Sequence, residues 1–131
     1  MTTGAFVSDS AQSGLSEEEC RTLLRSRTLG RVALVSGALP AIVPVEYVYD
    51  ESTITFRSEH DAKLRGVSTG DVLAFEVDSY DPESGDVASV HVLGRMSVLT
   101  EPVAPGVAPH AEYVRLHCEI VNGRRVRSPR D

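Results

Sequence analysis

The sequence predicts a mainly β fold, a six-stranded antiparallel split β-barrel with two or so short helices. Its 131 residues suit a single domain, and most of it consists of short β-type runs separated by polar or glycine-containing breaks. Trp is absent and aromatic residues make up only 5%, so the core must consist mainly of Val, Leu, Ile and Ala, which favours strands. Helical patterns do not follow each strand, which disfavours a parallel doubly wound sheet.

Composition divides the chain into three parts. Residues 1–14 are small and polar without a period, which predicts a flexible leader. Residues 15–127 form the predicted barrel domain, and residues 128–131 form a C-terminal tail. The basic stretch that begins at Gly123 is expected to be loose.

A helix is predicted over residues 16–27. Ser16 and Glu19 have the spacing of a capping box, and apolar residues then recur at helical spacing up to the stop at Gly30. A second, shorter helix is expected to begin at Ser58 as its N-cap and to reach about Val67.

The strands are predicted from runs of β-type residues. These runs are 31–36, 41–49, 53–58, 71–77, 87–99 and 112–121. Gly94 is expected at a bend at a barrel corner, and residues 101–109, with three prolines, are expected to be a connection. Pro44 cannot donate a ladder hydrogen bond, so we expect it at a bulge, at a sheet edge, or where something other than a strand approaches the backbone.

The stretch from residue 40 to 64 places two cations, Arg57 and Lys63, where a strand leads into the second helix. The first backbone N–H groups of a helix have no internal partner and carry partial positive charge. Together with Ser58 at the predicted N-cap, this junction suits an anion. We interpret it as the site for the phosphate of a flavin-type cofactor.

Charge and hydropathy exclude several classes of function. A net charge of −6 argues against general nucleic-acid binding. No apolar run approaches the roughly 20 residues that span a bilayer, and the N-terminus lacks the pattern of a signal peptide, so a cytoplasmic protein is expected with no membrane partner.

The Cys and His residues do not form a recognisable catalytic or metal motif. Cys20 and Cys118 lack metal-ligand spacing, so no metal site is predicted and two buried thiols are expected. His60 beside Asp61 lacks an activated serine, which disfavours hydrolysis. His91 is expected to be a packed, hydrogen-bonded residue rather than a base.

Over residues 15–127 the chain resembles the pyridoxamine 5′-phosphate oxidase-like, FMN-binding split barrels. The resemblance rests on segments in a fixed order, which are LSEEECRTLLRS, TLGRVALV, PAIVPVEYVYD, TITFRSEHDAKL, VLAFEVDSYDPESG, SVHVLGRMSVL and NGRRV. It implies a homodimer with the flavin in a groove at the subunit interface.

The resemblance also implies which residues contact the cofactor, and these fall into three groups according to the part of the flavin that each contacts. They are Val43, Pro44, Val45 and Ser89 for the ring, Phe56, Arg57 and Ser58 for the ribityl-phosphate arm, and Lys63 for the phosphate itself.

Three positions depart from true pyridoxamine phosphate oxidases, which have arginine at Ala41, a second phosphate arginine at Ala62 and a substrate-binding lysine at Glu46. A carboxylate at Glu46 would repel a phosphorylated substrate, so pyridoxamine phosphate is not the expected substrate. Glu46 is thus either a residue that contacts the substrate or an exposed strand residue. Tyr47 is either a residue that contacts the substrate or an aromatic residue of the core or of the dimer interface. The missing arginine weakens the case for tight FMN binding, and a deazaflavin is the alternative cofactor, with haem more distant.

Two functions follow from the resemblance. The first is an FMN- or deazaflavin-dependent oxidoreductase that acts on an unidentified small molecule. The second is a non-catalytic flavin carrier or sensor, or a dimeric barrel without a cofactor. No catalytic residue is assigned, because a flavin carries the electrons itself and the protein positions it.

Overall fold

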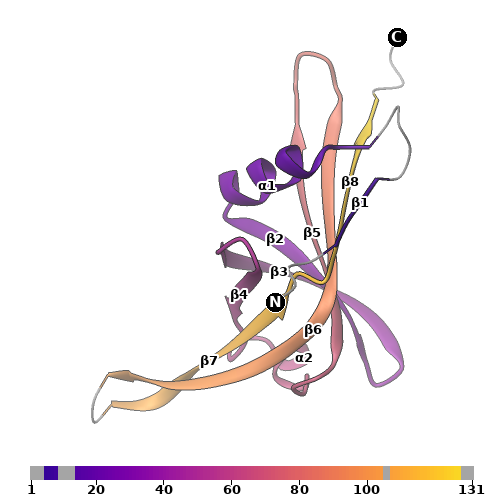
Figure 1. The fold of residues 1–131 in the computed structure, drawn as a ribbon. Coiled ribbons are helices and arrows are strands. Elements are labelled where there is room, and N and C mark those ends of the chain that lie inside the picture. Colours follow the sequence, from indigo (N-terminus) through magenta and orange to yellow (C-terminus); the bar gives the residue numbers. More distant parts are fainter. Residues whose placement is uncertain (1–4, 9–13, 105–106, 128–131) are drawn as a thin grey trace.

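A computed structural model describes residues 5–8, 14–104 and 107–127 (Figure 1). The helices are α1 (Glu17–Ser26) and α2 (Ala62–Arg65). The strands are β1 (Ala5–Ser8), β2 (Leu29–Ser36), β3 (Leu39–Tyr49), β4 (Thr53–Arg57), β5 (Val72–Tyr80), β6 (Val87–Ala104), β7 (Val107–His117) and β8 (Ile120–Val126).

The six strands β2 to β7 close into an antiparallel barrel in the order β6-β5-β2-β3-β4-β7, and β7 pairs again with β6. This confirms the predicted fold class. Two further strands extend the sheet outside the closed ring, because β8 pairs with β6 and β1 pairs in parallel with β8.

The barrel closes because β6 changes partner along one edge. Residues 87–93 of β6 pair with β8, and from Met96 onward the same edge pairs with β7. Gly94 lies at the changeover, where an added Cβ atom would lie 1.8 Å from the carbonyl oxygen of His117. Only a residue without a side chain permits this approach, so Gly94 does mark a corner of the barrel.

The core follows from strand alternation, since every second side chain of a strand points into the barrel. Completely buried examples are Val32, Ile54, Val90, Val114 and Leu116. Helix α1 adds its apolar side, Cys20, Leu23 and Leu24, to this core. Both cysteines are free and buried, as expected.

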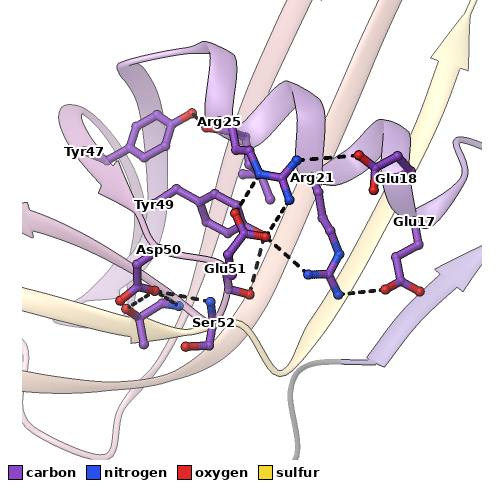
Figure 2. Close-up of polar contacts among 11 residues, drawn as sticks. Glu17, Glu18, Arg21, Arg25, Tyr47, Tyr49, Asp50, Glu51 and Ser52 are labelled. Carbon is purple, nitrogen blue, oxygen red and sulfur yellow. Dashed lines mark hydrogen bonds and ion pairs between the residues drawn. The ribbon is translucent and has the colours of Figure 1, made fainter.

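The turn between β3 and β4 is fixed to α1 by a carboxylate clamp (Figure 2). Glu51 accepts two hydrogen bonds from Arg25, at 2.6 and 2.7 Å, and one from Arg21 at 3.3 Å. Glu51 has a positive φ of 82°, an unfavourable conformation for a residue with a side chain. The clamp therefore holds the turn in place, and it sets the position of β3 and β4 relative to α1.

The N-terminal prediction needs correction where the structure describes it. Residues Ala5–Ser8 are not flexible leader but form β1, paired with Ile120–Gly123 of β8. A short run of this kind becomes a strand because β8 presents an open edge to it. The rest of the predicted leader up to residue 13 lies outside the described residues.

The C-terminal half also differs from the prediction. Residues 101–109 are not a connection, because β6 continues to Ala104 and β7 starts at Val107. The two strands form a hairpin arm that extends away from the barrel, with an irregular register at Pro102 (Figure 1). Prolines are tolerated there because each strand of a two-stranded arm has a free edge.

The last predicted strand, 112–121, is in fact the end of β7 and the start of β8, separated by Cys118 and Glu119. The basic stretch from Gly123 is ordered as far as Val126, because β8 pairs with the first half of β6. The tail 128–131 lies outside the described residues. Within the described part of the chain, no helix is both long and apolar enough to cross a membrane.

We predict that Gly94→Ala destabilises the protein by about 3 kcal/mol or more, because its Cβ atom would overlap a backbone carbonyl that cannot move without opening the barrel. Urea unfolding followed by circular dichroism measures the change. Gly66→Ala is the matched control, since its nearest neighbour would be an ordinary 3.6 Å away. Equal stability of the two variants would contradict the role assigned to Gly94.

Candidate functional site

The barrel is split between β3 and β4. These strands pair only over Tyr47–Tyr49 and Ile54–Phe56. The N–H of Tyr47 donates to the carbonyl of Thr28 at 2.9 Å, on the β2 side. Since successive residues of a strand direct their backbone groups to opposite edges, Pro44 and Glu46 direct theirs to the β4 side, beyond the point where pairing ends.

This open edge explains Pro44. Its missing N–H falls where no described strand pairs with β3, so no ladder hydrogen bond is lost. The edge still offers the carbonyls of Pro44 and Glu46 and the N–H of Glu46. An unpaired strand edge of this kind can hydrogen-bond a flat ligand that has both donors and acceptors.

A groove of about 480 Å³ lies against this edge. Its lining consists of Val43, Pro44, Val45, Glu46, Arg57, His60, Asp61 and Leu64. The side chains of Val43 and Val45 are buried in the core, so β3 offers mainly its backbone and the exposed residues Pro44 and Glu46. β4 and the loop before α2 supply the other charged groups.

The predicted anion site at the start of the second helix is not built as expected. Helix α2 is only one turn long, and its N-cap is Asp61 rather than Ser58. Asp61 accepts hydrogen bonds from the N–H groups of Lys63 and Leu64 at 2.8 and 3.1 Å. A carboxylate therefore already satisfies these amides. Lys63 is exposed on α2, beside the groove but not among its lining residues.

Arg57 enters the groove lining as part of a local cluster. Its guanidinium forms an ion pair with Glu59 and lies 6.0 Å from the centre of the Tyr113 ring. The hydrogen bond from Arg57, together with a backbone donor from Glu112, lowers the pKa of Glu59 to about 2. One of the two cations that were expected at the phosphate site therefore has an internal partner.

Three predicted site residues have side chains that turn away from the groove. Phe56 and Ser58 are 2% and 1% exposed, and the N–H of Ser58 donates to the carbonyl of Glu112 at 2.9 Å. The hydroxyl of Tyr47 donates to the carbonyl of Leu24 at 2.8 Å, and burial raises its pKa to about 12. Tyr47 is thus a core residue that joins β3 to α1, and the side chains of Phe56 and Ser58 are buried and are not among the residues that line the groove.

A second hollow, of about 320 Å³, lies on the outer face of the sheet. It is lined by Arg31, Ala33, Ile42, Ala74, Phe75, Glu76 and His91. Ile42 on β3 borders this hollow and the next residue, Val43, lines the groove, but the two spaces share no lining residue.

Strand register aligns a polar row across this hollow, with Arg31 opposite Glu76 and Glu76 opposite His91. Arg31 binds Glu76 at 2.8 Å and also pairs with Asp78. Burial acts to raise the pKa of Glu76, but hydrogen bonds from Arg31 and His91 outweigh it and hold the pKa below its usual value.

His91 is oriented by the carboxylate of Glu76. Its Nε2 atom lies 2.9 Å from Oε2 of Glu76 and 3.0 Å from Oγ of Ser89. A carboxylate only accepts, so in the neutral imidazole Nε2 carries the proton and Nδ1 keeps a lone pair. Because Ser89 meets the same nitrogen as Glu76, the imidazole does not activate it as a nucleophile.

His91 was predicted to be packed and hydrogen-bonded, and the structure confirms the hydrogen bonds but not the packing. The side chain is half-exposed on the outer face, with Ser89 on the same side of β6. Alternation along β6 placed both residues on one face, but only the pairing of β2, β5 and β6 brings Arg31 and Glu76 alongside. Ser89, predicted to contact the flavin ring, is instead a buried residue bonded to His91, and it is not among the residues that line the groove.

Comparison with known proteins identifies the family. The family model for pyridoxamine 5′-phosphate oxidase matches residues 16–108. An uncharacterised protein of Mycobacterium tuberculosis is 32% identical over 93 residues, which cover 67% of this chain and 61% of that relative. The chain thus spans about three fifths of the length of this curated relative.

Two solved structures share the fold. An FAD-binding protein of Mycobacterium smegmatis is 28% identical with a TM-score of 0.71, over 88% of this chain and 98% of that protein. An FAD-binding protein of Mesorhizobium loti is 23% identical with a TM-score of 0.65, over 86% of this chain and 94% of the other.

The orientation of His91 makes a prediction that NMR can test. We expect the Nε2–H tautomer for neutral His91, because Glu76 accepts from that nitrogen, and Glu76→Gln should reduce this preference. Long-range ¹H–¹⁵N spectra distinguish the tautomers. Glu83→Gln, an equal charge change in an exposed loop, should leave His91 unchanged. A dominant Nδ1–H tautomer in the unmodified protein would refute the arrangement.

Proposed function

The chain belongs to the pyridoxamine 5′-phosphate oxidase family, and from that premise we propose that its groove binds a flavin and that it is an oxidoreductase acting on a small molecule. The observation that carries the proposal is the open backbone edge of β3 along the groove. The similarity to the FAD-binding protein of Mycobacterium smegmatis supports a flavin as the class of cofactor.

The groove fits the chemistry of a flavin ring. The pyrimidine side of the ring alternates carbonyl acceptors with one N–H donor, and the edge offers carbonyls at Pro44 and Glu46 and an amide at Glu46. Arg57 lines the groove and Lys63 lies beside it, where either cation would bind the phosphate arm. The flavin, when bound, supplies the electron transfer.

FMN is the form of cofactor that we propose, because its single phosphate matches two nearby cations. FAD and a deazaflavin are the alternatives within the same class of ring, and haem is more distant. The carboxylates Glu46 and Asp61 line the groove, so a phosphorylated substrate such as pyridoxamine phosphate would be repelled. The substrate we propose is therefore an uncharged or cationic small molecule.

The polar row on the outer face is separate from the proposed flavin site. His91 lies on β6, three strands away from β3 in the order β3-β2-β5-β6, and Glu76 orients its imidazole. Arg31 is already paired with two carboxylates, so it orients Glu76 and does not attract an anion into the hollow.

A homodimer is part of the proposal, and the outer face of the sheet supports it. Register aligns Ile42, Ala33, Ala74, Leu93 and Ile120 as one apolar row across β3, β2, β5, β6 and β8. Several large apolar side chains around the row are more than half exposed, among them Ile42 at 71%. An exposed apolar surface of this extent marks an interaction site.

A second copy of the chain is the partner we propose for this face. The polar row beside the apolar one contains both signs of charge. Arg31 pairs with Glu76 and Asp78, and Glu76 also contacts His91. A two-fold axis brings the same patch of two copies together, so a patch with both signs can pair with itself. The dimer would also border the groove, since β3 contributes to both surfaces.

The absorbance spectrum of the purified protein with added FMN, FAD or deazaflavin tests the cofactor. We predict FMN binding at micromolar concentration, weakened several-fold by Lys63→Ala because one charge-assisted contact is lost. Arg65→Ala removes the same charge from the same helix at a position that is not expected to contact the phosphate, and should have little effect. If none of these cofactors binds at that concentration, the cofactor proposal fails.

Turnover distinguishes an enzyme from a carrier once binding is shown. Reduction of the bound flavin by a panel of uncharged and cationic small molecules, followed by absorbance, would support the oxidoreductase. A flavin that binds but is reduced by none of them, at any pH, would instead favour the carrier or sensor.

Light scattering after size-exclusion chromatography tests the dimer. We predict that Ile42→Asp shifts the protein from dimer to monomer, since it replaces the most exposed large side chain of the apolar row with a charge. Ser84→Asp adds the same charge to an exposed loop and should leave the dimer intact. A protein that is monomeric without any substitution would refute this part of the proposal.

A further inference from the structure

Glu59 lies in a ring of groups that are suited to bind an anion. Its carboxylate forms an ion pair with Arg57, lies 3.2 Å from Nε2 of His60 and accepts a hydrogen bond of 3.1 Å from the N–H of Glu112. A guanidinium, an imidazole and a backbone amide are also the donors that hold phosphate oxygens. The chain's own carboxylate thus occupies an anion site.

The site opens onto the groove. Arg57 and His60 are lining residues, whereas Glu59 lies behind them with its side chain 18% exposed. Its low pKa, held down chiefly by Arg57, keeps the carboxylate ionised at every pH at which the protein is expected to work. A ligand that reaches Arg57 from the groove therefore meets a competing anion at all times.

The alternative phosphate positions nearby are less suitable. Asp61 already satisfies the amides of Lys63 and Leu64, and α2 is a single turn. Ser58 is buried and bonded to Glu112. This leaves the cluster between β4 and β7 as the place where several donors converge and reach the groove.

We propose that Arg57, His60 and the amide of Glu112 form a phosphate-monoester site and that Glu59 is its built-in competitor. The inference rests on the proposed flavin site and concerns how that site discriminates among its ligands. A phosphate carries more negative charge than a carboxylate and has three acceptor oxygens, so it can displace Glu59 from Arg57. Glu59 is held nearby by the chain, so it reduces the affinity that the cations would otherwise give.

The consequence is a specific role for Glu59. It weakens the binding of phosphorylated flavins and leaves the binding of the flavin ring unchanged, because the ring contacts β3. Glu59 therefore sets the ratio of affinities between a flavin with a phosphate and one without. Lys63, exposed on α2, adds a second cation to the bound phosphate.

Titration of FMN and riboflavin by flavin fluorescence, with the full chain, tests the role. We expect Glu59→Gln to tighten FMN binding by at least about fivefold and to change riboflavin binding less than about twofold, since the amide keeps the shape but loses the charge. Glu83→Gln makes the same change of net charge in an exposed loop and is expected to alter neither affinity. The double variant Arg57→Ala and Glu59→Gln should lose the gain.

An unchanged ratio of the two affinities in Glu59→Gln would overturn the inference. So would an equal gain for both ligands, or the same gain in Glu83→Gln. If Glu59→Gln does not fold, Glu59→Asp replaces it, because the shorter side chain reaches Arg57 less well. It is expected to give a smaller gain for FMN alone, and no gain would count against the role.

Inorganic phosphate separates this inference from the proposed function. Phosphorus NMR with the unmodified protein and with Glu59→Gln should show tighter phosphate binding in the variant, even if no flavin binds to either. Tighter phosphate binding in the variant, with no flavin bound to either protein, would refute the flavin proposal and support the anion site. Flavin binding to the unmodified protein, with no effect of Glu59→Gln on FMN or on phosphate, would support the flavin proposal and refute the role of Glu59.

Discussion

The contact between Gly94 and the carbonyl of His117 is the constraint on which the rest of the structure depends. It lets β7 end against the middle of β6. The second half of β6 can then pair with β7 and close the barrel, while its first half pairs with β8 in the outer part of the sheet. The outer sheet in turn carries the apolar row and the polar row with His91. Both proposed surfaces therefore exist because one strand changes partner without a break.

The groove has a related origin, since it lies where a pairing stops. β3 pairs with β2 from Leu39 to Glu46 but with β4 only over Tyr47–Tyr49, which leaves backbone groups free on one edge of β3 in an otherwise closed barrel. The clamp of Glu51 on α1 holds the far end of the same two strands. Stability and binding thus use adjacent parts of one hairpin: the paired end packs on the core, and the open end faces the ligand site.

The charges around the groove limit what it can bind. Acidic groups equal or outnumber the cations that face it, and the closest cation, Arg57, is already paired with Glu59. A ligand must therefore gain much of its affinity from the backbone edge and from its ring, with the phosphate contributing less than the cations alone would suggest. This balance suits a flavin more than a phosphorylated substrate.

The sequence by itself determined the class of fold, the capping box at Ser16, the corner at Gly94 and the position of Pro44 at an unpaired edge, because each depends on local geometry or on alternation along one strand. Only the tertiary structure decided that the amide of Glu112 meets Glu59 beside Arg57, and that Arg31, Glu76 and His91 meet. These are contacts among loops and strands whose register no local pattern specifies. The same reason explains β1 and β8, which become strands because a neighbour offers them an edge.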